Sequence, residues 1–133
     1  MFSKLIETSD LKVFYKLFSV ELNDFWKTHY TFKAISRKIA KKLTKSFVDL
    51  LLINTIIPLK FNYLKGRGEV EETEFLCLIQ QLKSEKNSII DKFNELKISS
   101  KNAFETQALL QLKNNYCAKK RCLQCAIGNV ILK

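Results

Sequence analysis

The chain has little of what reverses a backbone, because only 3 glycines and 1 proline occur among its 133 residues. Folds with many short strands rely on these residues for their turns, so their scarcity argues against a large sheet. Hydrophobic residues make up 47% of the chain and charged residues 27%, which is the balance of a globular protein. We therefore expect an all-α fold, a compact irregular bundle of about five to seven helices in a single domain over residues 1–133, with a cysteine-containing C-terminal segment.

A secretory leader and a long apolar run are also missing. Residues 1–10 hold no apolar core followed by small residues. The longest apolar stretch, residues 50–59, is interrupted by Asn54 and Pro58 and is too short to span a bilayer. We expect a cytoplasmic protein without a transmembrane segment, where thiols stay reduced and structural disulfides do not form.

Groups for acid–base catalysis are scarce as well. His29 is the single histidine, and no P-loop, dinucleotide-binding glycine motif or nucleophile elbow is present. The glutamates between 69 and 74 complement the dipole of a helix start and have no histidine beside them in sequence. No catalytic residue is assigned, and we expect this chain not to be an enzyme.

Positive charge is abundant, and it is unevenly spread. The net charge is +10, with twelve Lys/Arg against five Asp/Glu in residues 1–65, and five Lys/Arg with no acid in residues 113–133. Such basic ends favour a polyanionic partner, either nucleic acid, an acidic protein or an anionic membrane surface. Solubility alone explains the charge equally well.

Residues 32–47 have the pattern of a basic amphipathic helix. Apolar residues recur every three or four positions at Phe32, Ile35, Ile39, Leu43 and Phe47. The cations on the other faces, joined by three near the C-terminus, are the candidate nucleic-acid-binding residues: Lys33, Arg37, Lys38, Lys41, Lys42, Lys45, Lys119, Lys120 and Arg121. A membrane-surface helix and a solvated outer face are the alternatives.

Residues 46–64 are apolar on most sides, which is typical of a central core helix, and Pro58 should kink that helix. Further apolar residues at helical spacing predict helices over 70–83, beyond 84 and beyond 100. The residues that we expect to start helices are Ser9–Asp10, Ser46, Ser84 and Ser99–Ser100.

Three cysteines form a cluster, Cys117, Cys122 and Cys125. The two-residue spacing of the last pair suits a chelated ion, and the basic loop before it favours thiolates, so we predict a zinc or iron–sulfur site. The fourth ligand is missing from this segment, and the remaining candidates are His29 and Cys77. The segment 25–30 is dense enough in aromatic residues to belong to the core. His29 lies in this segment and is better explained as a hydrogen-bonded core residue, and Cys77 as a small buried hydrophobe. Packing of three reduced cysteines and dithiol redox chemistry stay open as alternatives.

Several segments together resemble a bacterial family catalogued as domain of unknown function 2851. The matching residues, in chain order, are 25–32, 52–58, 61–63, 84–87, 107–109, Tyr116-Cys117, Cys122, Cys125 and Gly128. Leu64 departs from the pattern, which has glycine there. The resemblance implies no established activity. It implies that this chain is the C-terminal part of a longer architecture, whose strand-rich N-terminal region is similar to a metal-dependent nuclease.

Two functional hypotheses follow. The first is an accessory domain that binds nucleic acid and holds a structural metal or cluster at its cysteines. The second is a structural or protein-interaction domain without a ligand, whose cysteines belong to the core and whose exposed apolar patch docks the missing N-terminal region. An enzyme acting through the Cys122–Cys125 pair is a third and narrower possibility.

Overall fold

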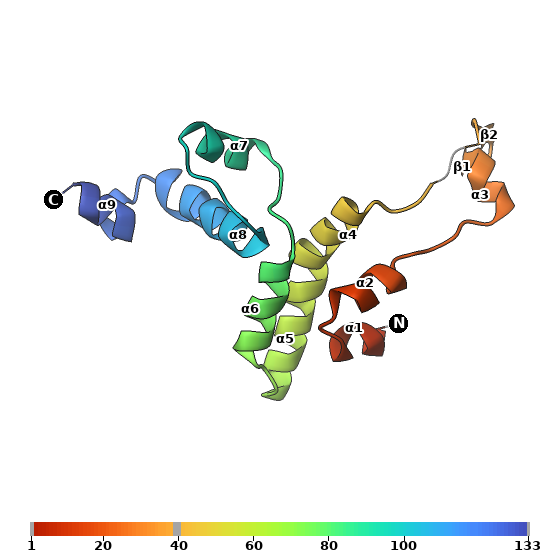
Figure 1. Ribbon diagram of the computed structural model, residues 1–133, viewed down its shortest axis with the longest axis horizontal. Helices are drawn as coiled ribbons and strands as arrows, with labels where there is room; N and C mark the ends of the chain where they lie inside the picture. Colours follow the sequence, from red (N-terminus) through yellow and green to blue (C-terminus); the bar gives the residue numbers. More distant parts are fainter. Residues whose placement is uncertain (1, 39–40, 133) are drawn as a thin grey trace. The chain divides into compact units, whose positions relative to one another are not determined.

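The computed structural model describes residues 2–38 and 41–132, and helices dominate this part of the chain (Figure 1). Joined through their π-helical turns, the segments of the described residues make eight helices, beside two short strands. The all-α class is therefore confirmed. The helices form two compact units that divide between Glu71 and Glu72. The prediction of one domain over residues 1–133 stays a prediction.

Unit 1, up to Glu71, contains short helices followed by a long one. The helix α2 (Leu11–Leu17) begins where a side chain caps it: Asp10 Oδ1 accepts from the backbone N–H of Lys12 at 2.8 Å, so the start predicted at Ser9–Asp10 is confirmed. The elements are α1 (Phe2–Glu7), α2 (Leu11–Leu17), α3 (Asp24–Thr28), β1 (His29–Thr31), β2 (Ala34–Ile35), α4 (Lys45–Leu51), the π-turn η1 (Leu52–Ile56) and α5 (Ile57–Arg67).

The last three elements form one continuous helix of 23 residues, Lys45–Arg67. It begins at Thr44, whose Oγ1 accepts from the N–H of Phe47 at 3.2 Å, so the cap lies two residues before the predicted Ser46. It ends at Gly68, whose φ of 72° lies in the left-handed region that favours glycine.

Pro58 disturbs this helix as expected, although the disturbance is a widening of the turn. Proline has no N–H, so it cannot bond the carbonyl four residues before it. Just ahead of it the backbone opens into a π-turn, in which the N–H of Ile57 donates to the carbonyl of Leu52. The turn therefore holds one residue more than an α-helical turn, and the helix continues through it.

The core of unit 1 joins this long helix to α2. Phe14 of α2 is fully buried, and so is Leu52 of the helix, with Val48, Ile53 and Ile57 nearly so. Two charged residues of the same helix are also buried. Lys60, 2% exposed, donates to the carbonyl of Thr8 and to Ser9 Oγ, each at 2.7 Å. Asp49 accepts from the hydroxyl of Tyr15 at 2.5 Å.

The long helix is also apolar enough to cross a membrane, judged by length and composition alone. One such helix is weak evidence, because a core helix passes the same test. Asp49 of this helix accepts a hydrogen bond from Tyr15 of α2, and Lys60 donates one to Thr8 in the turn before α2. Such contacts are typical of a core helix. The absence of a transmembrane segment stays a prediction, since the helix extends well beyond the short run 50–59.

In unit 2, from Glu72 onward, asparagines cap the N-termini of two helices. Asn87 Oδ1 accepts from the N–H groups of Ile89 and Ile90 at 3.0 Å, and Asn102 Oδ1 accepts from that of Glu105 at 3.0 Å. These caps lie two to three residues after the predicted serines. The elements are α6 (Glu72–Gln81), α7 (Ser88–Glu95), α8 (Ala103–Leu112), the π-turn η2 (Lys113–Cys117), the 3₁₀ turn η3 (Cys122–Gln124) and α9 (Ala126–Ile131).

Backbone pairing ties the middle of unit 2 together. Lys83 and Asn102 form an antiparallel bridge, and the N–H of Ala103 donates to the carbonyl of Leu82 at 3.0 Å. The buried residues around this pairing are Leu78, Leu82, Ile90, Ala103, Glu85 and Thr106. The end of α6 and the start of α8 are therefore held side by side.

The predicted basic helix over 32–47 is wrong. Residues 29–35 form the antiparallel pair β1–β2, with His29 opposite Ile35, and helix begins only at Lys45. A helix would place Lys33 beside Arg37 and Lys38 beside Lys42, and such like-charged pairs four residues apart repel. Tyr30, Thr31 and Ile35 are β-branched or aromatic and suit a strand. Ile39, part of the predicted apolar stripe, lies outside the described residues.

Candidate functional site

The aromatic hairpin, residues 24–35 from α3 through β2, presents rings to solvent. Asn23 starts α3 by accepting from the N–H of Trp26 at 3.2 Å. Trp26 and Phe32 pack edge to face, with ring centroids 5.1 Å apart. Phe32 lies in the turn between the strands and is 81% exposed, while Tyr30 is 64% exposed. Exposed rings gathered on one short segment mark a candidate interaction surface.

His29 supports this hairpin from within. Its ring stacks on Phe25 with centroids 4.1 Å apart and an angle of 5° between the planes. Its Nδ1 lies 2.9 Å from the carbonyl of Phe25 and 3.0 Å from Thr28 Oγ1. The imidazole is hydrogen-bonded, as predicted, and its Nδ1 is already engaged. It is half-buried, so its predicted place in the core is wrong.

Lys41 closes the hairpin. Its ammonium donates to the carbonyls of Trp26 at 2.8 Å and His29 at 2.6 Å. It also lies 3.6 Å from the centroid of the Tyr30 ring, a close cation–π contact. This predicted nucleic-acid-binding cation is therefore bound to the protein itself, and its contacts give it a structural role.

Other predicted cations stay open to solvent around the same hairpin. Lys33 follows Phe32 in the turn, and Arg37 and Lys38 follow β2; all three are exposed. Between residues 21 and 45 the chain carries seven Lys/Arg against two Asp/Glu. The hairpin therefore combines exposed rings with exposed positive charge on one short segment of unit 1.

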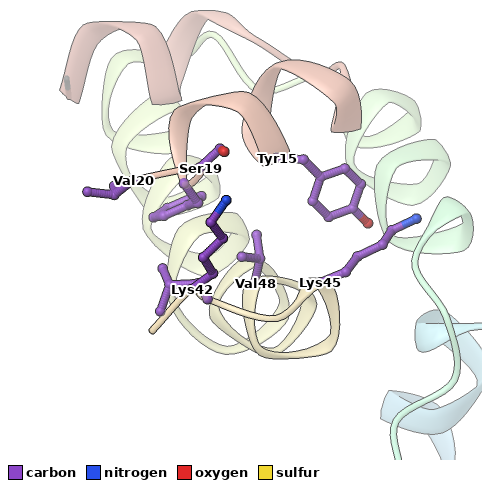
Figure 2. A pocket seen from close by; sticks show the side chains of 8 residues that line it. Tyr15, Ser19, Val20, Lys42, Lys45 and Val48 are labelled. Carbon is purple, nitrogen blue, oxygen red and sulfur yellow. The ribbon is translucent and has the colours of Figure 1, made fainter. Parts of the chain in front are cut away.

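Lys42 and Lys45 line a pocket of about 300 Å³ in unit 1 (Figure 2). Its other walls come from α2, the chain just after it, the segment before α4 and α4 itself: Tyr15, Phe18, Ser19, Val20, Leu43 and Val48. The Lys45 ammonium lies 4.7 Å from the centroid of the Tyr15 ring. Burial and the neighbouring Asp49 carboxylate, in that order, raise the pKa of Tyr15 well above its usual value, so its hydroxyl stays a donor.

The remaining predicted cations, Lys119, Lys120 and Arg121, lie in unit 2 and are exposed. Lys119 donates to Asn115 Oδ1 at 3.2 Å. Lys120 has a φ of 53°, an unusual backbone conformation for a residue with a side chain. This residue reverses the chain between Cys117 and Cys122.

The predicted metal centre is not assembled. Across residues 2–38 and 41–132, no three His, Cys, Asp or Glu side chains come together to hold a metal ion. Cys117 and Cys122 are exposed, whereas Cys125 is only 8% exposed. Metal or cluster binding by these cysteines therefore stays a prediction. The alternative that all of them are core residues is wrong for Cys117 and Cys122 and right for Cys125.

Cys77 is exposed on α6, so its interpretation as a buried small hydrophobe is wrong. The buried residues of this helical run are Phe75, Leu78 and Leu82, which recur at spacings of three and four. Cys77 precedes Leu78 directly and is thus turned about 100° away from that face.

Unit 2 contains a buried glutamate that no local sequence pattern indicates. Glu85 Oε2 accepts from Gln107 Nε2 at 2.5 Å and lies 3.5 Å from Thr106 Oγ1. Thr106 donates more closely to the carbonyl of Ala103, at 2.9 Å, so Gln107 is the main partner. Residues 84–87 and 107–109 both belong to the noted resemblance, and that shared membership was the only signal for their contact.

The fold therefore defines a small all-helical protein with an exposed aromatic and basic hairpin. A family model described as Protein of unknown function (DUF2851) matches residues 1–88, about two thirds of the chain, and the chain belongs to this family. The match includes the aromatic hairpin and Glu85, and the cysteine segment lies beyond it. Neither the curated proteins nor the solved structures contain a match to this chain.

Proposed function

We propose that this chain binds single-stranded nucleic acid on the aromatic hairpin. The observation that supports the proposal is the exposure of Phe32 and Tyr30 beside Lys33, Arg37 and Lys38. Proteins that bind single strands stack bases on such rings and track the phosphates with neighbouring cations. The net charge of +10 supports a polyanionic partner in the same way.

A single strand fits this surface better than a duplex. In a duplex the faces of the bases are stacked on one another, so an exposed ring cannot reach them. Reading the edges of bases in the major groove commonly uses a helix, and residues 32–44 form none among those described. Stacking accepts every base, so we expect weak sequence preference.

Contacts within the hairpin and from Lys41 hold its exposed rings in place. Lys41 fixes the carbonyls of Trp26 and His29, and its contact with Tyr30 sets the direction of that ring. Trp26 supports Phe32 from the side. Lys42 and Lys45, from the pocket beside α2, supply two further cations from the same basic segment.

Fluorescence anisotropy of labelled oligonucleotides about 12 nucleotides long, titrated with the full chain, tests this proposal. A Tyr30→Ala/Phe32→Ala variant should raise Kd about tenfold or more, since each stacked base contributes about 1–3 kcal/mol. Ile35→Ala is the matched control: Ile35 is 82% exposed in the same hairpin but has no ring. Its Kd should stay near that of the wild type.

The salt dependence of Kd tests whether the exposed cations contact phosphates. Changing Lys33, Arg37 and Lys38 to glutamine should lower the slope of log Kd against log salt by about 2, because three phosphate contacts are lost. Lys4, Lys12 and Lys16, exposed on α1 and α2, give a control of equal charge. Equal losses in both triple variants, or no binding by the wild type at low salt, would overturn the proposal. Wild-type binding unchanged by the ring substitutions would assign the exposed rings to a protein partner instead.

A further inference from the structure

We infer that Cys122 and Cys125 form a redox-active dithiol, which closes to an intramolecular disulfide by exchange with a low-molecular-weight disulfide such as glutathione disulfide. The inference concerns unit 2 and does not depend on nucleic-acid binding. It rests on the backbone of the turn, on the unequal exposure of the two thiols and on the charges beside them.

The turn brings the two cysteines together. Cys122–Gln124 is a 3₁₀ turn, and the N–H of Cys125 donates to the carbonyl of Cys122 at 3.2 Å. In a turn closed by such a bond, residues three apart have their Cα atoms within about 7 Å. A disulfide needs Cα atoms about 4.4–6.8 Å apart, so the bond can form with little movement of the backbone.

The start of α9 fixes this turn. The N–H of Asn129 donates to the carbonyl of Cys125 at 2.9 Å. Gly128 lies directly against the turn, because a Cβ at this position would stand within 2.2 Å of the carbonyl oxygen of Cys122. On the other side, the N–H of Gln124 donates to the carbonyl of Arg121 at 3.1 Å. The two cysteines are thus held in place before any bond joins them.

The two thiols differ in exposure, and this difference indicates that Cys122 reacts first. Cys122 is exposed and can meet a disulfide from solution, whereas Cys125 is 8% exposed. The exposed cations Lys119, Lys120 and Arg121 precede Cys122 directly. They attract glutathione disulfide, which carries a net negative charge at neutral pH, toward Cys122.

The exchange proceeds in two balanced steps. The Cys122 thiolate attacks one sulfur of glutathione disulfide; that S–S bond breaks, a bond from Cys122 to glutathione forms, and one glutathione thiolate leaves. Cys125 then gives its proton to solvent and attacks the sulfur of Cys122, which releases the second glutathione thiolate. Cys122 and Cys125 each give one proton to solvent before they attack, and each released glutathione thiolate takes one proton back from solvent. Two cysteine thiols are oxidised in total, and one glutathione disulfide is reduced to two thiols.

Mass spectrometry of the full chain, oxidised with glutathione disulfide under metal-free conditions, alkylated and digested with trypsin, tests the inference. Residues 122–133 form one tryptic peptide with both cysteines, while Cys117 falls in residues 114–119. The wild-type peptide 122–133 should be lighter by two hydrogens than its reduced, unalkylated form and should resist alkylation. Cys117→Ser should leave this result unchanged.

The single variants separate the two roles. Cys125→Ser should accumulate glutathione on Cys122, because no second thiol resolves the adduct. Cys122→Ser should acquire glutathione on Cys125 about tenfold more slowly, and urea should remove this difference because it arises from burial. Circular dichroism of each variant establishes that it is folded.

Two results would overturn the inference. In the first, the wild-type peptide 122–133 carries only glutathione adducts at every ratio of disulfide to thiol. In the second, protein purified without a chelator resists oxidation until a chelator removes a bound ion, which would make the two cysteines metal ligands.

Discussion

Unit 1 and unit 2 both bury charged side chains, but the groups that satisfy them differ. In unit 1, Lys60 reaches back 52 residues to Thr8, and Asp49 reaches back 34 residues to Tyr15. In unit 2, Glu85 reaches Gln107, 22 residues ahead, where Lys83 and Asn102 already join the same segments through the backbone. A buried charge should therefore contribute more to stability in unit 1, where short helices depend on side chains for attachment.

The largest effect is expected at Lys60. Lys60→Met keeps the volume of the side chain but leaves the Thr8 carbonyl and Ser9 Oγ without this donor. The free energy of unfolding of unit 1 should fall by about 3 kcal/mol. Urea denaturation followed by the fluorescence of Trp26, the single tryptophan, measures it. Lys65→Met, exposed on the same helix, should change the value by less than about 0.5 kcal/mol.

A smaller effect is expected at Glu85. Glu85→Ala removes the acceptor of Gln107 Nε2, and the local free energy of opening should fall by about 2 kcal/mol. Hydrogen exchange of the Ala103 amide, which bonds the carbonyl of Leu82, reports this opening. Glu85→Gln keeps an acceptor and should restore about half of the loss. A loss at Glu85 equal to or larger than that at Lys60 would contradict the comparison between the units.

The smallest effect is expected at Tyr15. Tyr15→Phe keeps the ring and removes only the hydrogen bond to Asp49, at a cost of about 1 kcal/mol near pH 7. The wild type should also respond to alkali. Because the pKa of Tyr15 is raised in the folded chain, the folded state holds its proton more tightly, and stability falls as the pH rises above about 10.

That alkaline loss supplies a control within one titration. Tyr15→Phe should lose less stability than the wild type between about pH 10 and 11, since its ring cannot ionise. Trp26 fluorescence in urea at each pH gives both curves. Parallel curves for the two proteins would show that Tyr15 does not couple unit 1 to pH.

The sequence predicted the class of fold and several helices well. Few glycines argue against a fold with many turns, and apolar residues that repeat every three or four positions indicate helices. It placed helix starts less accurately. Around Ser46, Ser84 and Ser99–Ser100 several Ser, Thr and Asn residues lie close together, and packing selected Thr44, Asn87 and Asn102. The start at Ser9–Asp10 was placed correctly.

The site was predicted in part. The basic segment was found, but its helix was not, since apolar spacing alone ignores repulsion between cations and the bonds from Lys41 to Trp26 and His29. The aromatic segment 25–30 was predicted to be core, and this is wrong, since Phe25 and Tyr30 are exposed. Nothing in the pattern of the aromatic residues tells an exposed ring from a buried one. The contact of Glu85 with Gln107 joins distant segments, and local pattern carries no information about it.

The π-turn at Leu52–Ile56 has a consequence for the evolution of this helix. Asp49 and Lys60 lie on opposite sides of the turn, and each must reach its own partner in the N-terminal segment. Deleting one residue from the turn would leave a continuous helix but rotate one side against the other by about 100°. The two buried charges therefore fix the number of residues between them. The helix can change its composition far more freely than its length.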